Sequence, residues 1–182
     1  MKTNIFKLAA ILLILAGGII SCKDKEKEKP FTLKGTKWYL IGIVDVETGD
    51  MTELEREGYG LLNPDEFYTI VFDAPQPLRA CGASAAGMCS WGEPAADNFF
   101  WGRMATNQIG GDYEIDYKIG AFRFTKFDIT EAGCMRWCKD EDLYAQNLRQ
   151  VQSFVIKDTH PRILHLYTND GKNYLKYKKI GG

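Results

Sequence analysis

Trp38-Tyr39-Leu40-Ile41-Gly42-Ile43-Val44-Asp45 is the stretch that decides the fold. Its residues alternate between two faces of an extended chain, and it is rich in aromatic and β-branched side chains, which favour strands. Working outward from it, runs of the same kind predict further strands at 51–54, 67–72, 99–106, 113–119, 122–129, 153–157, 163–168 and 173–177. The turn Asn169-Asp170-Gly171 joins the last two as a hairpin.

One helix is expected among these strands, from Asp140 to Val151. Asp140 is suited to cap it, and Tyr144, Leu148 and Val151 follow at the spacing of one apolar stripe. The fold class is therefore mainly β (α+β). We expect an antiparallel, partly closed sheet or barrel of about seven or eight strands with one packed helix.

The first 30 residues have the features of an export and anchoring segment. Lys2 and Lys7 precede an apolar run from Leu8 to Ile20, which is too short for a transmembrane helix and fits a signal peptide. Ile19-Ile20-Ser21-Cys22 resembles a bacterial lipobox. This predicts a signal peptide at 1–21 and lipidation of Cys22, against the alternative of an ordinary secreted protein with a cysteine there by chance.

A charged tether follows the predicted cleavage site. Within the tether at 22–30, residues 23–29 carry four lysines and three acids and no apolar side chain, so they should stay solvated. The lysine and acidic residues that directly follow Cys22 resemble the export signals of Bacteroidota surface lipoproteins. We expect one domain at 31–182, held in the cell envelope as an outer membrane lipoprotein on the surface or on the periplasmic face.

Charge argues against nucleic-acid binding. The 23 basic and 24 acidic residues of the chain include six lysines and three acids in the first 30 residues, which leaves the predicted domain at about −4. A nucleic-acid binder normally presents a basic face.

Four cysteines remain in the domain: Cys81, Cys89, Cys134 and Cys138. An even number in an exported chain favours two disulfides, in any of three pairings. Free thiols are a second reading. A zinc site is a third, but only the pair separated by three residues has the spacing of a zinc knuckle. We therefore expect no metal.

Aromatic residues form the most conspicuous candidate binding surface. Phe99, Phe100 and Trp101 are consecutive, so a strand must point at least one of them away from the core. The loop insertion at 78–97, which contains Trp91, either covers them as a second small core or leaves an exposed patch. Trp137 is the remaining candidate member of this patch.

No catalytic constellation is predicted. His165 lies between Leu164 and Leu166 and is expected on the opposite, outward face, and His160 precedes Pro161 in a turn. Cys89 is followed by Ser90 rather than directly by an aromatic residue, unlike a cysteine protease. Asp112, Glu114 and Asp116 share one face of a strand, which fits a solvated face better than a calcium site. We expect neither an enzyme nor a cofactor.

Several short motifs resemble the META (HslJ-like) domain family, in the family's order and over most of the domain. They are Gly35 to Leu40 with Trp38, Asn107 with Gly110 to Tyr113, Thr130 with Cys134, Glu141 with Leu148 and Val151, Leu164 to Leu166, and Leu175 to Tyr177. The family often has a cysteine before the asparagine, where this chain has Ala105-Thr106. The resemblance implies a β-rich envelope domain without established catalysis.

Together these observations favour a lipid-anchored, non-enzymatic binding or scaffolding module. Its expected partner is an envelope protein or a small apolar ligand. The alternative is a calycin-like barrel that binds a small ligand in an internal cavity. The two differ in whether the aromatic side chains point outward or inward.

Overall fold

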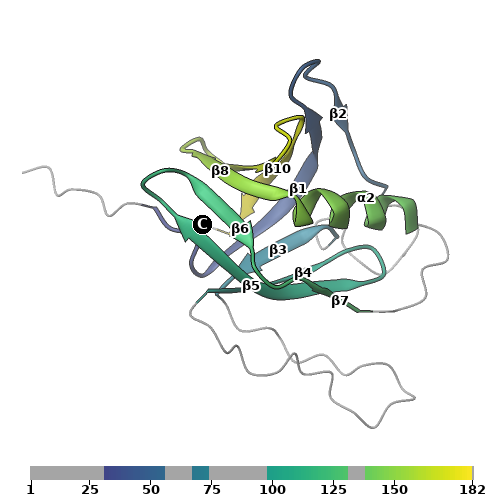
Figure 1. Cartoon of the computed structure of the whole chain (residues 1–182), viewed down its shortest axis with the longest axis horizontal. Coiled ribbons are helices and arrows are strands. Elements are labelled where there is room, and N and C mark those ends of the chain that lie inside the picture. Colours follow the sequence, from purple (N-terminus) through teal and green to yellow (C-terminus); the bar gives the residue numbers. More distant parts are fainter. Residues whose placement is uncertain (1–30, 56–66, 74–97, 131–137, 182) are drawn as a thin grey trace, which may run out of the picture. The chain divides into compact units, whose positions relative to one another are not determined.

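A computed structural model describes residues 31–55, 67–73, 98–130 and 138–181. Eight of the described strands close into an antiparallel ring in the order β10, β9, β8, β6, β5, β4, β3, β1, and β1 pairs again with β10 (Figure 1). The ring strands are β1 (Thr36–Asp45), β3 (Thr69–Phe72), β4 (Phe99–Arg103), β5 (Gln108–Asp116), β6 (Ala121–Phe124), β8 (Val151–Lys157), β9 (Ile163–Thr168) and β10 (Asn173–Ile180). The predicted fold class is confirmed, with a ring that closes completely.

Two short strands lie beside the ring. β2 (Met51–Thr52) pairs with the end of β1, and β7 (Asp128–Ile129) pairs with β5. The single strand predicted at 122–129 is thus two strands, β6 and β7. Between them Thr125 and Lys126 both donate to the Asp112 carbonyl, which breaks the ladder. Gly111 permits this close crossing, because a Cβ there would lie 2.1 Å from the Lys126 carbonyl oxygen.

The inward face of β1 changes along the strand because of a bulge at Ile41. Leu40 pairs with Tyr177, but the next pair is Gly42 with Lys176. As a result Ile43, opposite the buried Leu175, continues the inward face that Leu40 begins. The simple alternation expected from the sequence holds only up to this bulge.

The helix in the described part of the chain is α2 (Cys138–Arg149). It begins and ends two residues earlier than predicted. It ends before Val151 because Val151 pairs with Thr168 as the first residue of β8. Tyr144 and Leu148 are fully buried, as the apolar stripe predicts. Asp140 lies inside the first turn rather than at the cap, and accepts a hydrogen bond from the Glu55 amide at 2.6 Å.

Aromatic side chains fill the interior of the ring. Phe72 packs edge-on against Tyr113, Tyr113 stacks on Phe122 with ring centroids 5.3 Å apart, and Phe122 meets Phe124. Phe100 lies 4.4 Å from Phe124, centroid to centroid. α2 lies across the end of the ring where β1 meets β2 (Figure 1), and the Tyr177 hydroxyl, inside the ring, donates to the Tyr144 hydroxyl of α2 at 3.0 Å.

This packed interior argues against the calycin-like alternative. An internal ligand site needs apolar residues that line a space. Here the inward aromatics contact one another instead, and Trp38, Phe72, Phe100, Phe122 and Tyr177 have at most 2 % of their surface exposed. The calycin-like reading is not favoured.

Several predicted features lie outside the described residues. They are the signal peptide at 1–21, the tether at 22–30 with Cys22, the loop insertion at 78–97, and the residues Cys81, Cys89, Trp91, Cys134 and Trp137, together with the side chain of Cys138. The domain boundaries therefore stay predictions. No helix in the described ranges is long and apolar enough to cross a membrane.

Candidate functional site

The predicted aromatic patch is divided by the wall of the barrel. Phe100 points inward and is buried, whereas Phe99 and Trp101 point outward and are half-buried. This agrees with the expectation that three consecutive aromatics cannot share one face. Phe100 is therefore no part of an outer surface, and the described members of the patch are Phe99 and Trp101.

The carboxylates of β5 behave as a solvated face. The Glu114 carboxylate pairs with the Arg123 guanidinium of β6 at 2.6 Å, and Asp116 accepts a hydrogen bond from the Lys118 amide. An open pocket of about 510 Å³ lies beside them, lined by Asn98, Glu114, Ile115, Asp116, Ala121, Phe122, Arg123 and Gln152. Among the described residues, no group of three or more His, Cys, Asp or Glu side chains is placed to hold a metal.

A buried carboxylate ties α2 to the barrel. Glu141, in the first turn of α2, accepts hydrogen bonds from the amides of Thr106 and Asn107 and from Asn107 Nδ2, the last at 2.8 Å. Thr130 completes the group: its hydroxyl donates to Asn107 Oδ1 and accepts from the Gln108 amide. Negative charge at a helix amino terminus is also favoured by the helix dipole.

This Glu141 network unites residues that are far apart in the sequence. Asn107, Thr130 and Glu141 are three of the positions that carry the META resemblance. Their hydrogen bonds fix the β4–β5 turn, the residue after β7 and the start of α2 to one another. Glu141 was expected only as one of the positions of the META resemblance, and nothing local in its sequence indicated a partner on another element.

His165 occupies a second buried polar position, on the outside of the barrel. It faces away from Leu164 and Leu166 as predicted, but it is 3 % exposed rather than a surface residue. Its ring stacks on Tyr174 with centroids 4.4 Å apart, and Nδ1 lies 3.4 Å from the Tyr167 hydroxyl. Nε2 is buried and has no hydrogen-bond partner in the described part of the chain.

The surroundings of His165 favour its neutral form. Burial, together with the positive charges of Lys157 and Lys176, lowers the pKa of the imidazole to about 4. The register of the β9–β10 hairpin could have predicted this cluster of His165 with two tyrosines. Tyr167 pairs with Tyr174, and His165 pairs with Lys176 two residues away on the same face. His165 is thus a packed histidine on the outer face, held between two tyrosines.

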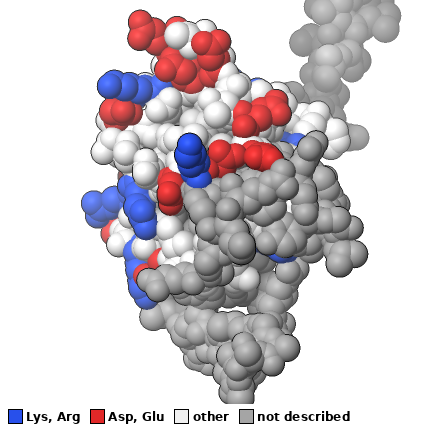
Figure 2. Space-filling model, turned by 90° about the vertical axis from the view of Figure 1, so that its right-hand side faces the viewer, with Lys and Arg blue, Asp and Glu red and all other residues white. Residues whose placement is uncertain are grey.

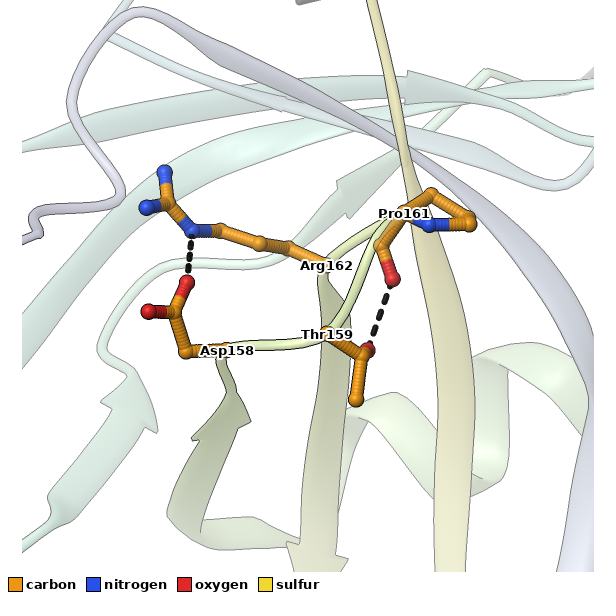
Figure 3. A network of polar contacts seen from close by, with 4 residues as sticks. All are labelled: Asp158, Thr159, Pro161 and Arg162. Atoms are coloured by element: carbon orange, nitrogen blue, oxygen red, sulfur yellow. Dashed lines mark hydrogen bonds and ion pairs between the residues drawn. The ribbon is translucent and has the colours of Figure 1, made fainter.

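His160 lies in the β8–β9 loop and is exposed. Figure 3 shows how this loop is held: Arg162 Nε donates to Asp158 Oδ1 at 2.7 Å, and the Thr159 hydroxyl donates to the Pro161 carbonyl at 2.7 Å. These contacts order the backbone on both sides of His160. They give the loop a structural explanation that needs no catalytic role.

Comparison with known proteins supplies a fold and one partial relative. No family model matches the chain. Over 61 residues, 33 % of this chain, it is 44 % identical to a Tannerella forsythia protein named "Putative lipoprotein", and the match spans 43 % of that protein.

Two solved structures are similar in shape. A Burkholderia xenovorans protein solved by NMR has a TM-score of 0.54 at 16 % identity, covering 85 % of this chain and 92 % of that one. A DUF4847 family protein from Bacteroides vulgatus has a TM-score of 0.48 at 13 % identity, covering 80 % and 93 %. The first similarity supports the fold alone.

We predict that Glu141→Gln lowers the free energy of unfolding by about 2–3 kcal/mol, because an amide nitrogen would face backbone or Asn107 donors in a buried site. Asp142→Asn is the matched control. It removes the same charge from the same helical turn at an exposed position, and should change stability by less than about 1 kcal/mol. Urea unfolding of both variants measures the difference, and equal losses would contradict the role of the network.

The pKa of His165 predicts a pH effect on stability. Because the folded protein binds this proton with a pKa of about 4 instead of 6.5, the free energy of unfolding should fall as the pH drops from about 6.5 towards 4. The contribution is on the order of 2 kcal/mol, on top of the carboxylate titrations. His165→Phe removes this titrating group and with it this contribution to the pH dependence. The free energy of unfolding of the variant should therefore fall less than that of the wild type between about pH 7.5 and pH 4.5. Parallel pH profiles for the two proteins would refute it.

Proposed function

We propose that this chain is the precursor of a Bacteroidota-type lipoprotein, and that its mature form is a lipid-anchored, non-enzymatic binding or scaffolding module of the cell envelope. The observation that carries the anchor is the Ile19-Ile20-Ser21-Cys22 motif behind a short apolar run and a positive start. The name of the Tannerella relative supports it. The proposed location is the outer membrane, with the lipid on the sulfur of Cys22.

The packed interior supports a role for the outer surface. Since aromatic side chains fill the ring, recognition falls to the outside of the barrel and to its loops. Phe99 and Trp101, on the outer face of β4, are the described residues we propose for this surface, with Trp91 and Trp137 as its remaining members. A protein partner in the envelope suits an outer aromatic surface better than a small ligand does.

The non-enzymatic part of the proposal rests on the histidines. These are the two residues of the chain best suited to act as a general base near neutral pH. His165 packs between Tyr174 and Tyr167 with a strongly lowered pKa, and His160 lies in an exposed loop. Both positions have structural explanations.

Membership of the META (HslJ-like) family is the finer part of the proposal. It is supported by the way Asn107, Thr130 and Glu141, three positions of the resemblance, hydrogen-bond to one another. If the family uses these three positions to hold the fold together, mutating any one of them should disrupt the whole network.

The anchor is tested by Cys22→Ala in the full-length precursor, expressed in a Bacteroidota host. We expect the wild type to incorporate a clickable fatty acid and to partition into the Triton X-114 detergent phase. The variant should incorporate none and remain in the aqueous phase, because a thioether-linked lipid supplies the membrane affinity. Ser21→Ala is the control, since it alters the residue next to the cysteine and leaves the lipid acceptor in place. Lipid incorporation by the Cys22→Ala protein would contradict the proposal.

A further inference from the structure

Exposed apolar side chains gather at the β5–β6 turn, residues 117–120. Ile119 is 77 % exposed and Tyr117 45 %, and both belong to this turn. Val155 of the neighbouring strand β8 is 44 % exposed. The Phe154 amide donates to the Gly120 carbonyl at 2.9 Å, and the Tyr117 ring packs edge-on against Phe154, so the turn lies directly beside β8. Single exposed apolar residues are common, but two within one four-residue turn, with a third on the neighbouring strand, are less so.

The same turn holds the start of the domain. Leu33 is fully buried, and its amide donates to the Tyr117 hydroxyl at 2.8 Å. Burial raises the pKa of Tyr117, so this hydroxyl stays neutral at physiological pH. Cys22 lies eleven residues before Leu33, which is a reach of at most about 40 Å for an extended chain. Leu33, the first residue of the barrel unit, therefore lies at the end of the barrel that carries the turn.

Charge distinguishes the two ends of the barrel. The turn end carries the exposed Lys34, Lys118 and Lys157. The exposed Asp116 and Asp158 lie at the same end, and Asp158 pairs with Arg162, so cationic side chains are in excess there. The opposite end carries an acidic β1–β2 loop, with Asp45, Glu47 and Asp50. Figure 2 shows acidic side chains gathered at the top of the molecule, where Figure 1 places this loop. A surface that presents lipid phosphates would attract the first end and repel the second.

We propose that the β5–β6 turn is a second membrane contact, in which Ile119 enters the head-group region of the leaflet that holds the lipid of Cys22. This rests on the lipid anchor proposed above. Tyr117 lies at the polar boundary, where tyrosine is favoured, and Lys118 meets lipid phosphate. The contact orients the barrel so that the acidic β1–β2 loop and α2 face away from the membrane.

Hydroxyl-radical footprinting of the lipidated protein tests this orientation. The protein is bound to vesicles of phosphatidylethanolamine and phosphatidylglycerol and compared with the Cys22→Ala chain in solution. Met51, 41 % exposed at the opposite end, is the internal reference for Tyr117. We expect the oxidation of Tyr117 and Ile119 relative to Met51 to fall roughly threefold or more on vesicles. An unchanged ratio would overturn the proposal.

Two variants separate membrane contact from a folding effect. Ile119→Asp in the lipidated protein should restore the Tyr117 to Met51 ratio to its value in solution, because a carboxylate resists burial in the head-group region. Val46→Asp, at a residue 48 % exposed in the β1–β2 loop, should leave the vesicle ratio low. If Ile119→Asp keeps the low ratio, the turn is not the contact.

Failure of the anchor is distinguishable from failure of this contact. If wild-type protein carries no lipid and does not sediment with vesicles, the proposed function fails first. If lipidated protein sediments with the vesicles but Tyr117 remains as reactive as in solution, the anchor stands and the second contact is wrong.

Discussion

The pairing of β1 with β10 is the interaction on which the rest of the structure depends. It joins the first and last strands of the domain from Lys37 opposite Ile180 to Asp45 opposite Asn173, and it turns an open antiparallel sheet into a ring. Without it, β1 and β10 would each expose an unpaired edge of backbone groups, which is a template for aggregation. With it, Leu40, Ile43, Leu175 and Tyr177 meet inside the ring and α2 can close its end.

Closure also gives the two ends of the barrel different properties. One end carries the first buried residue, Leu33, the β5–β6 turn and the β8–β9 loop. The other carries the β1–β2 loop, the β4–β5 turn and α2, which Glu141 fixes to that turn. The packed interior leaves the outside of the barrel and its loops as the surfaces available for contact, and Leu33 lies at the first of these two ends.

Much of the fold was predictable because its signals are local. Aromatic and β-branched alternation located most of the ring strands, although β5 begins at Gln108, five residues before its predicted start. The stripe of Tyr144 and Leu148 located α2. The bulge at Ile41 and the break between β6 and β7 were not predictable, since both arise from pairing with distant strands. The same is true of the candidate sites. The burial of His165 depends on Tyr174 across a hairpin, and the role of Glu141 depends on Asn107, 34 residues away.

Amide hydrogen exchange, resolved residue by residue, tests the closed ring most directly. If β1 and β10 close it, their amides should exchange only through global unfolding, as slowly as those of β9. The exposed amides of the β1–β2 loop, whose hydrogen bonds are mostly local, should exchange faster. The β6–β8 seam, which pairs at Ala121 and Ser153, should open more readily. If the amides of β10 that face β1 exchange as fast as those of the loop while β9 stays protected, the ring is open between β1 and β10. That result would contradict the closed ring.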